Sequence, residues 1–415
     1  MFIFFTIAFF IVLLLRNITQ KKWVAYTYIV SVYLLSLLGS LLMCISEPVI
    51  FSVITLFPSM LFCVLLWGTF SPFSQKEPIL VVDNSDTFIK RFTTAGYVIS
   101  LGLFIACLLL FTRVRDAFAY GLVDIREDMY KGVETFTGST ILEHIGHSAL
   151  RWLGGLVYPL LLMFFYSIAY IPEKKLLKIM LFISSLSASY LGMLNGGRTK
   201  LIYWFLFAGF CLCLFYKKIP KKTKWPIAVV AVPIVYIIAQ YFFLITEGRA
   251  ENANREANLF IRDYLGQSYI NFCSFINNLD YHPYSFRRIF PLTTSFFGPY
   301  FDLGQYRWLI ANNSGGMNIG IFYTFMGDIF VDLGLFGLVL YIVLVFGVIG
   351  NKVCKKKTIS FSQLLIICIF AEVIIHGVFY YSMYQRETSV GVILTLLLSK
   401  YLETKTNTKI SEINN

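Results

Sequence analysis

The chain has 415 residues, of which 57% are hydrophobic, 18% aromatic and only 14% charged, and its mean hydropathy is +0.70. Soluble globular proteins are about 45–50% apolar and about 25% charged, and a water-facing surface cannot hide so large an apolar excess. The composition excludes a soluble enzyme, a disulfide scaffold and a disordered chain. It predicts a polytopic membrane protein, whose net charge of +12 points to nucleic acid, anionic lipid or an anionic substrate.

Apolar stretches of spanning length follow one another along the whole chain, which predicts a single all-α integral membrane domain over residues 1–415. A spanning helix needs about 20 mostly apolar residues. We expect about eleven transmembrane helices, of which the first and last are short, and we interpret the first as a span and not as a signal peptide. They lie near residues 1–15, 23–45, 48–70, 93–112, 151–170, 179–195, 199–216, 226–245, 319–350, 361–380 and 388–401.

Three lysine-rich connections, residues 174–178, 217–224 and 352–357, set the orientation. Short loops rich in Lys and Arg stay on the cytoplasmic side. The cytoplasmic side then also holds residues 16–22, 71–92 and the tail, 402–415. With Glu173 and Lys400, which border these stretches, it carries 21 basic and six acidic residues, against 14 basic and 17 acidic residues elsewhere. Topology thus explains the lysine clusters, and we expect no nucleic-acid partner.

The extracytoplasmic side holds arginine where the cytoplasmic side holds lysine. Of the 14 basic residues outside the cytoplasmic loops, 12 are Arg, and the large loop 246–318 has six Arg and no Lys. Arg grips phosphate or carboxylate with two parallel hydrogen bonds, so this face is suited to an anion. The alternative is pairing of these arginines with neighbouring acids. The loop arginines are Arg249, Arg255, Arg262, Arg287, Arg288 and Arg307.

The first half of this loop, residues 255–279, has apolar residues near the 3.6-residue period of a helix. Arg255 and Arg262 are seven residues apart and share one face. We expect an amphipathic helix at the membrane surface with its arginine face towards the headgroups. The second half, rich in Pro and aromatic residues, is suited to stacking on sugar rings or to interfacial anchoring.

Two further stretches combine glycine with charge. In the turn Asn195–Lys200, two glycines permit tight backbone, and Arg198 precedes a helix N-terminus, which also favours anions. The alternative is a simple hairpin with an arginine reaching towards the interface. Asp328 and Asp332 are four residues apart on one face of a later span. They are suited to acid–base chemistry or, alternatively, to structural pairing with arginine.

The third stretch carries Glu372 and His376 four residues apart within a span, followed by Arg386 in a short outer turn. Ionisable residues inside a membrane are functional candidates by default, and His accepts a proton near neutral pH. A packing histidine is the alternative. His282 in the outer loop and Asp263 are further candidate bases. We find no P-loop, Rossmann fingerprint or metal-ligand spacing, so we expect no metal, cofactor or nucleotide site.

Together the turn LNGGRTKLI, the arginine-rich and aromatic outer loop and the run GMNIGIFYTFMGDIFVDLGLFG resemble bacterial O-antigen polymerases of the Wzy type. The resemblance implies a GT-C-like, metal-independent glycosyltransferase of the bacterial inner membrane, with its active site facing the periplasm. Its donor and acceptor would be undecaprenyl-diphosphate-linked oligosaccharides, polymerised into O-antigen or a capsular or exopolysaccharide. A chain-length regulator protein and membrane lipid would be further partners.

The resemblance gives the residues their expected roles. Arg198 matches the family's diphosphate-binding turn, and Arg249 and Arg262 are of the kind the family places in its outer loop. We add Arg255 and Arg288 as diphosphate ligands. The candidate catalytic bases are His376, Asp263 and His282, in falling order, and the expected supporting residues are Asp328, Asp332, Glu372 and Arg386. The alternatives are a flippase or secondary transporter of lipid-linked oligosaccharides, and an O-antigen ligase.

Overall fold

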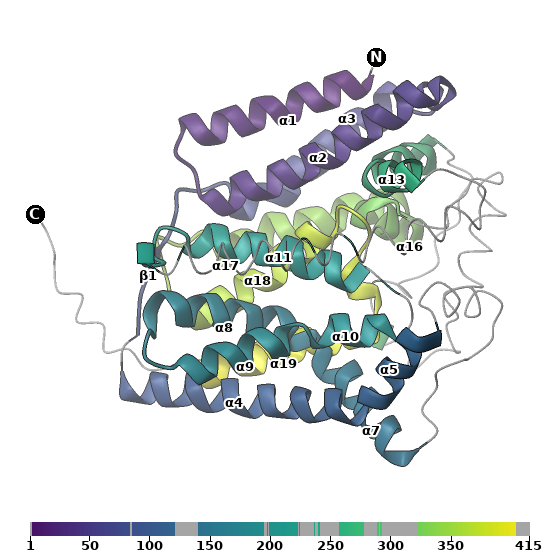
Figure 1. The fold of residues 1–415 in the computed structure, drawn as a ribbon. Helices are drawn as coiled ribbons and strands as arrows, with labels where there is room; N and C mark the ends of the chain where they lie inside the picture. The colour runs from purple at the N-terminus through teal and green to yellow at the C-terminus, as the bar shows by residue number, and fades with distance from the viewer. Residues whose placement is uncertain are drawn as a thin grey trace, which may run out of the picture.

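The chain folds into a bundle of helices, most of which run parallel or antiparallel to one another (Figure 1). In the computed structural model the described residues are 2–83, 85–120, 140–194, 197, 199–222, 224, 236, 240, 257–277, 289, 291–292 and 322–403. The α-helices are α1 (Phe2–Thr19), α2 (Val24–Ser46), α3 (Leu56–Phe70), α4 (Asp86–Leu109), α5 (Phe111–Tyr120), α7 (Ile141–Leu153), α8 (Val157–Tyr170), α9 (Lys175–Ser185), α10 (Ser187–Met193), α11 (Thr199–Phe215), α13 (Ala257–Asn277), α16 (Thr324–Tyr341), α17 (Asn351–Cys354), α18 (Phe361–His376) and α19 (Arg386–Leu402). The shorter elements are the 3-10 turns η1 (Pro48–Ser52), η2 (Ser71–Phe73), η3 (Gly154–Leu156) and η5 (Ser382–Tyr384), the π-helical η4 (Ile342–Gly350), and the strands β1 (Ile79–Leu80) and β2 (Thr358–Ile359).

Seven helical segments in the described part of the chain are long and apolar enough to cross a membrane. Their outward faces carry large apolar side chains, such as Leu35 at 63% exposed and Val98 at 65% exposed. Helices that are apolar on every side are stable in a lipid environment, where the exposed face needs no polar residues. The prediction of an all-α membrane protein is confirmed.

Each predicted span overlaps one of these helices except 226–245, of which the structure describes only residues 236 and 240, and several boundaries differ. The predicted span 48–70 begins as a helix only at Leu56, because Pro48 starts the separate turn η1. The segment predicted as a loop before residue 151 contains α7. A capping box begins that helix: the Thr140 hydroxyl accepts from the Glu143 amide, and the Glu143 carboxylate accepts from the Thr140 amide.

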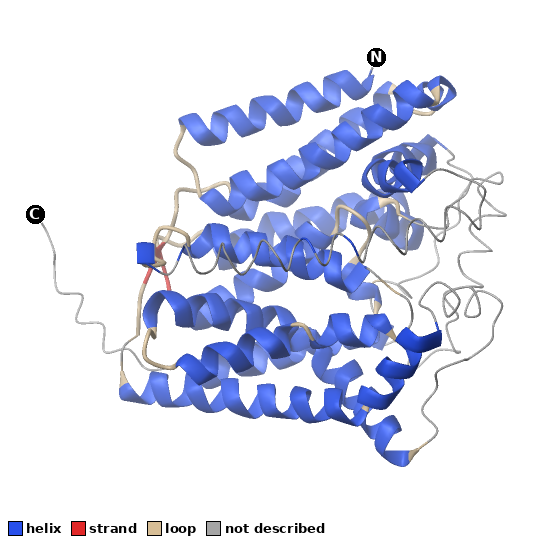
Figure 2. Ribbon diagram, in the orientation of Figure 1, coloured by secondary structure: helices blue, strands red, loops and turns tan. Residues whose placement is uncertain are grey.

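The connections predicted to share one side of the membrane meet at one end of the bundle, where both strands lie (Figure 2). β1 and β2 pair in parallel, with Ile79 opposite Thr358. The Trp23 amide donates to the Gln75 carbonyl (2.9 Å), and the Gln75 amide group donates to the Cys354 carbonyl (2.6 Å). The grouping of these loops by their lysine content is therefore consistent with the arrangement of the helices.

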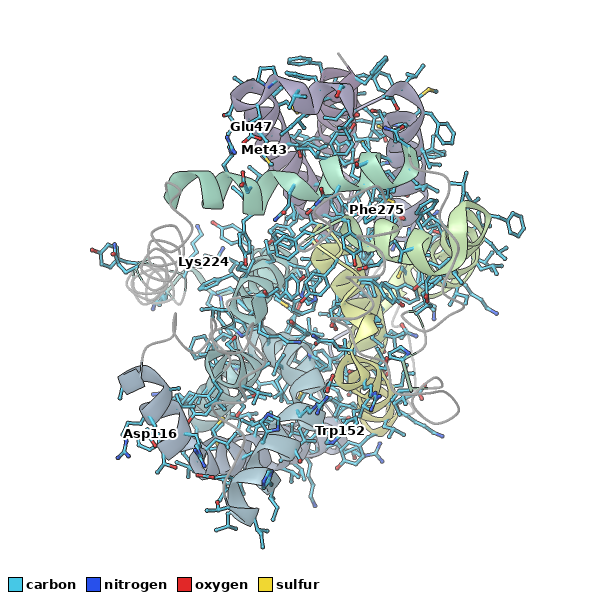
Figure 3. The ribbon with its side chains drawn as sticks, turned by 90° about the vertical axis from the view of Figure 1, so that its right-hand side faces the viewer. Met43, Glu47, Asp116, Trp152, Lys224 and Phe275 are labelled. Atoms are coloured by element: carbon cyan, nitrogen blue, oxygen red, sulfur yellow. The ribbon has the colours of Figure 1, made fainter. Side chains whose placement is uncertain are left out.

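The predicted outer-loop helix is α13, with bounds within two residues of those expected. At the opposite end of the bundle it lies crosswise over the other helices, with Glu47 near one of its ends and Phe275 near the other (Figure 3). Much of its second half is buried, since Phe272 and Cys273 are 0% exposed. α13 is thus packed into the bundle to a greater extent than a helix that only lies on a membrane surface.

Two glycines allow α13 to cross α2 in backbone contact. A Cβ atom added to Gly266 would lie 2.5 Å from the carbonyl carbon of Gly39. Two hydroxyl groups of α2 complete the contact: Ser36 donates to the Leu265 carbonyl (2.9 Å), and Ser40 donates to the Gly266 carbonyl (2.5 Å). Small residues and serine bonds of this kind join helices in membranes, where apolar side chains alone give little specificity.

Candidate functional site

A segment without α-helix, residues 377–385, which includes the turn η5, joins α18 to α19 inside the bundle. The amides of Tyr323 and Thr324, at the start of α16, both donate to the carbonyl of Phe379, at 3.1 and 2.9 Å. Irregular backbone at membrane depth is stable only where other protein groups satisfy its hydrogen bonds. Thr324 also has a φ of 61°, in the left-handed region that β-branched residues rarely adopt. This bonding fixes the segment and the end of α18 in place.

His376 is the last residue of α18 and is 1% exposed. Its ring stacks on Tyr203 of α11, with centroids 4.1 Å apart and planes 15° apart, and lies 4.7 Å from the ring of Tyr158 of α8. The Oε1 atom of Glu372 is 3.8 Å from His376 Nδ1, too far for a hydrogen bond. Neither ring nitrogen forms a well-aligned hydrogen bond to a described residue, although the backbone of Tyr203 lies close enough to interact with the ring. Packing between aromatic residues therefore explains the position of the His376 ring. It does not explain why two polar nitrogens are buried there.

The carboxylate of Glu372 is also within electrostatic range of Lys200, at the start of α11. The Lys200 ammonium donates to the Gln385 side chain (2.6 Å), and Lys200 is within electrostatic range of Glu387 as well. Glu387 in turn forms a close ion pair with Arg151 of α7. A chain of charged and polar groups thus runs from the start of α19 to the buried Glu372.

Sequence analysis missed most of this polar chain. Lys200 ends the stretch Asn195–Lys200, in which the sequence favours Arg198 as the anion ligand, and nothing in the sequence pairs this stretch with residues 385–387. The two tyrosines around His376 carry no signal either, because aromatic residues are common in the spans of this chain. The only available signal was the rarity of lysine outside the predicted cytoplasmic loops, where Lys200 was one of two.

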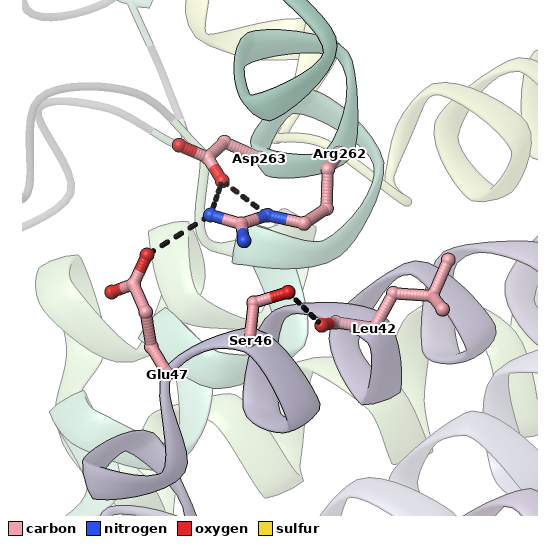
Figure 4. A network of polar contacts seen from close by, with 5 residues as sticks. All are labelled: Leu42, Ser46, Glu47, Arg262 and Asp263. Carbon is pink, nitrogen blue, oxygen red and sulfur yellow. Dashed lines mark hydrogen bonds and ion pairs between the residues drawn. The ribbon is translucent and has the colours of Figure 1, made fainter. Parts of the chain in front are cut away.

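Arg262 and Asp263 form a salt-bridge network with Glu47, the residue that follows α2 (Figure 4). Arg262 donates to Asp263 through Nε (3.0 Å) and Nη2 (2.8 Å), and Nη2 also donates to Glu47 (3.0 Å). Its side chain is only 10% exposed. Burial alone would lower the pKa of Arg262, but the hydrogen bonds and charges of the two carboxylates outweigh burial and raise the pKa.

This network confirms, for Arg262, the alternative in which outer arginines pair with neighbouring acids. A phosphate group would have to replace Glu47 or Asp263 to bind Arg262. Asp263 already accepts two hydrogen bonds from Arg262, which it would have to release to act as a catalytic base, so His376 is the better candidate. Glu47 was not predicted, because it lies more than 200 residues from its partner.

Asp328 and Asp332 are both 0% exposed and bond to backbone amides from other parts of the chain. Asp328 accepts from the Tyr381 amide (2.5 Å), and Asp332 accepts from the Ile289 amide (3.0 Å). The first bond attaches residues 377–385 to α16. These contacts are structural bonds to backbone amides, and the expected supporting role of both aspartates stays a prediction. Arg386 is the first residue of α19.

The other predicted site residues lie outside the described residues. They are His282, Arg198, Arg249, Arg255 and Arg288. Within the described chain, no group of three or more His, Cys, Asp or Glu side chains is placed to hold a metal ion.

A row of aromatic rings links the salt-bridge network to the buried histidine. Tyr264 of α13 lies 5.1 Å from Phe322, whose ring is parallel to that of Tyr380 at 6.0 Å. Tyr380 lies 5.5 Å from Tyr203, which stacks on His376. The structure thereby brings α13, the start of α16 and the end of α18 together, although they are far apart in sequence.

Comparison with protein-family models, with curated proteins and with solved structures finds no match to this chain. The function therefore has to be argued from the residues and their geometry.

Proposed function

We propose that this protein is an integral-membrane glycosyltransferase that polymerises polyprenyl-diphosphate-linked oligosaccharide repeat units. The observation that supports this proposal best is the buried His376, placed beside Glu372 and at the end of a row of aromatic rings, with ring nitrogens that form no well-aligned hydrogen bond to a described residue. A carboxylate next to an imidazole is suited to general-base chemistry, and aromatic rings are suited to stacking on sugars. The resemblance of the Gly-Gly-Arg turn to the O-antigen polymerases supplies the substrate class.

In the proposed reaction the acceptor is a sugar hydroxyl of a new lipid-linked repeat unit, and the donor is the growing chain. His376 accepts the hydroxyl proton, and the hydroxyl oxygen forms a bond to the anomeric carbon of the donor. The bond between that carbon and the diphosphate oxygen breaks, and the polyprenyl diphosphate leaves. Glu372, 3.8 Å from His376, stabilises the imidazolium that forms. The diphosphate link supplies the energy, so the reaction needs no nucleotide.

The leaving diphosphate is an anion, which cationic side chains at the outer end of the bundle would stabilise as charge develops. Arg198 is the sequence-based candidate, and Lys200 two residues later adds a second cation with a known position beside Gln385. Since His376 is 1% exposed, the acceptor reaches it only after neighbouring aromatic side chains move. Residues 377–385 carry two rings, Phe379 and Tyr380, that contact Tyr203, which itself stacks on His376.

Reconstitution with a purified polyprenyl-diphosphate-linked repeat unit tests the proposal directly. We expect a ladder of polymers without added nucleotide. His376→Gln should slow polymerisation about 10²–10⁴-fold, the usual contribution of a general base. His144→Gln is the matched control, because His144 is exposed on α7, and it should leave the rate unchanged. Polymerisation by His376→Gln at the unaltered rate would refute the role of His376.

The same preparation separates the alternatives. Translocation of the lipid-linked unit across the membrane without a ladder would identify a flippase, and transfer only to a lipid A core would identify a ligase. In cells, we expect Arg198→Ala to abolish long polymer while leaving lipid A capped with a single repeat unit. Normal chain lengths in that variant would contradict the assignment of Arg198.

A further inference from the structure

The strand-bearing end of the bundle carries a crowded group of basic side chains, which we term the basic platform. Its members come from three connections: the end of α1, the turn before β1 and the turn before β2. Backbone hydrogen bonds join these connections, including those from the Ile79 amide to the Lys357 carbonyl (2.9 Å) and from the Val81 amide to the Ile359 carbonyl (2.8 Å). The basic platform consists of Arg16, Lys21, Lys22, Lys76, Lys355, Lys356 and Lys357.

The closest charges of the platform have the same sign. Lys22 and Lys76 lie opposite each other in an antiparallel β-bridge, a position in which like charges are destabilising. Burial lowers the pKa of Lys22, and the positive charges of Arg16 and Lys355 lower it further. Glu77 is the one acidic residue on these three connections, and it pairs with Lys217 of another loop at 2.8 Å.

Membrane topology does not account for this arrangement. Orientation depends on how many Lys and Arg residues a loop carries, and separate flexible loops serve that purpose as well. Here the backbone holds the lysines of three connections close together, at an electrostatic cost that a bound anion would relieve. The need for a multivalent anion therefore follows from the rigid placement of the charges and not from their number.

The position of the platform indicates which anion. Lys21 and Lys22 follow α1 after a single residue, and Lys22 lies 5.6 Å above the ring of Tyr26 in the first turn of α2. Trp23 stacks on Phe73 at 5.6 Å beside it. Aromatic residues and lysines at the ends of spanning helices lie at the level of lipid headgroups, and basic pockets at this level bind phospholipids that carry several phosphates. We propose that the basic platform binds the headgroup of a phospholipid with two phosphates, of the cardiolipin type.

Native mass spectrometry of the full-length protein, titrated with cardiolipin, tests this site without any assay of activity. The triple variant Lys22→Gln, Lys76→Gln, Lys355→Gln should bind the first cardiolipin at least about tenfold more weakly than the unaltered protein. The control triple variant, Lys218→Gln, Lys221→Gln, Lys222→Gln, makes the same change of charge in an exposed loop and should bind within about twofold of the unaltered protein. An equal loss in both triple variants would refute a localised site.

Two competitors define the ligand. Phosphatidylglycerol at equal phosphate concentration should displace cardiolipin poorly, because each molecule carries one phosphate; equal competition would refute the two-phosphate site. Inorganic pyrophosphate that displaces cardiolipin completely would assign the platform to a soluble diphosphate and would also refute the proposal.

If the triple variant fails to fold, two other measurements test the site: cardiolipin binding by the single variant Lys22→Gln, and cardiolipin binding by the unaltered protein at rising ionic strength. Lys22→Gln should weaken cardiolipin binding because it removes one of the clustered charges. Raised ionic strength should weaken it because salt screens exposed charges.

Discussion

The substitution Gly266→Ala should separate α13 from α2 and thereby disturb both the fold and the candidate site. The new Cβ atom would lie 2.5 Å from the carbonyl carbon and oxygen of Gly39 and 2.7 Å from the Ser40 amide nitrogen. These are backbone atoms, which cannot rotate away. Restoring ordinary contact distances moves the helices apart by about 1 Å. The movement stretches the hydrogen bonds that Ser36 and Ser40 donate to α13.

The expected cost follows from these contacts. Overpacking costs about 1–3 kcal/mol, and each weakened hydrogen bond costs about 0.5–1.5 kcal/mol. Replacing a helical glycine with alanine returns about 1 kcal/mol. The free energy of unfolding should therefore fall by about 3 kcal/mol. The same movement draws Arg262 away from Glu47, which now lies 3.0 Å from it.

Unfolding by sodium dodecyl sulfate in mixed micelles, followed by circular dichroism, measures this change. Gly102→Ala in α4 is the matched control, because its Cβ atom would meet nothing closer than Leu153 Cδ1 at 3.9 Å. The control should be as stable as the unaltered protein, or more stable by up to about 1 kcal/mol. If Gly266→Ala were as stable as Gly102→Ala, the close crossing of α2 and α13 would be wrong.

Two further substitutions address the elements around the buried histidine. In Gly391→Ala the new Cβ atom would lie 2.6 Å from the Cα atom of Gly155; we expect a loss of about 1–3 kcal/mol in the same unfolding assay, and an unchanged value would contradict this helix contact. Asp328→Leu removes the acceptor of the Tyr381 amide and should cost about 1–3 kcal/mol, whereas Asp328→Asn keeps an acceptor and should cost less. Hydrogen exchange at Tyr381 should accelerate in Asp328→Leu only, and equal exchange in both variants would argue against this bond.

Hydropathy and lysine content were sufficient to predict the general architecture. Apolar runs of spanning length gave the helices, because a lipid environment requires them. The lysine-rich loops predicted which connections share one end, since charge is tied to topology. Helical periodicity identified α13 from residues such as Phe272 and Ile276, which are buried against neighbouring helices.

The candidate site was predictable only in part. Glu372 and His376 are four residues apart on one helix, so a local pattern was enough to pair them. The partners of Lys200 and Arg262 come from distant parts of the chain, and local periodicity carries no information about such contacts. The predicted span 361–380 was also too long, since α18 ends at His376. Residues 377–380 are apolar enough to continue a spanning helix, so hydropathy could not show where the helix ends. Their backbone bonds instead to the start of α16.

The parallel pair β1–β2 has a consequence for how the chain reaches its native state. It joins connections that are distant in the chain, as the bond between Gln75 and Cys354, 279 positions apart, also illustrates. Contacts between distant segments form late, because chain entropy opposes their closure. During synthesis β1 therefore leaves the ribosome long before β2 is made. Until then the backbone N–H and C=O groups of β1 stay unpaired with β2 while the intervening helices insert into the membrane. We expect the β1–β2 pair to be the last contact of this end to form, and the first to open when the protein unfolds.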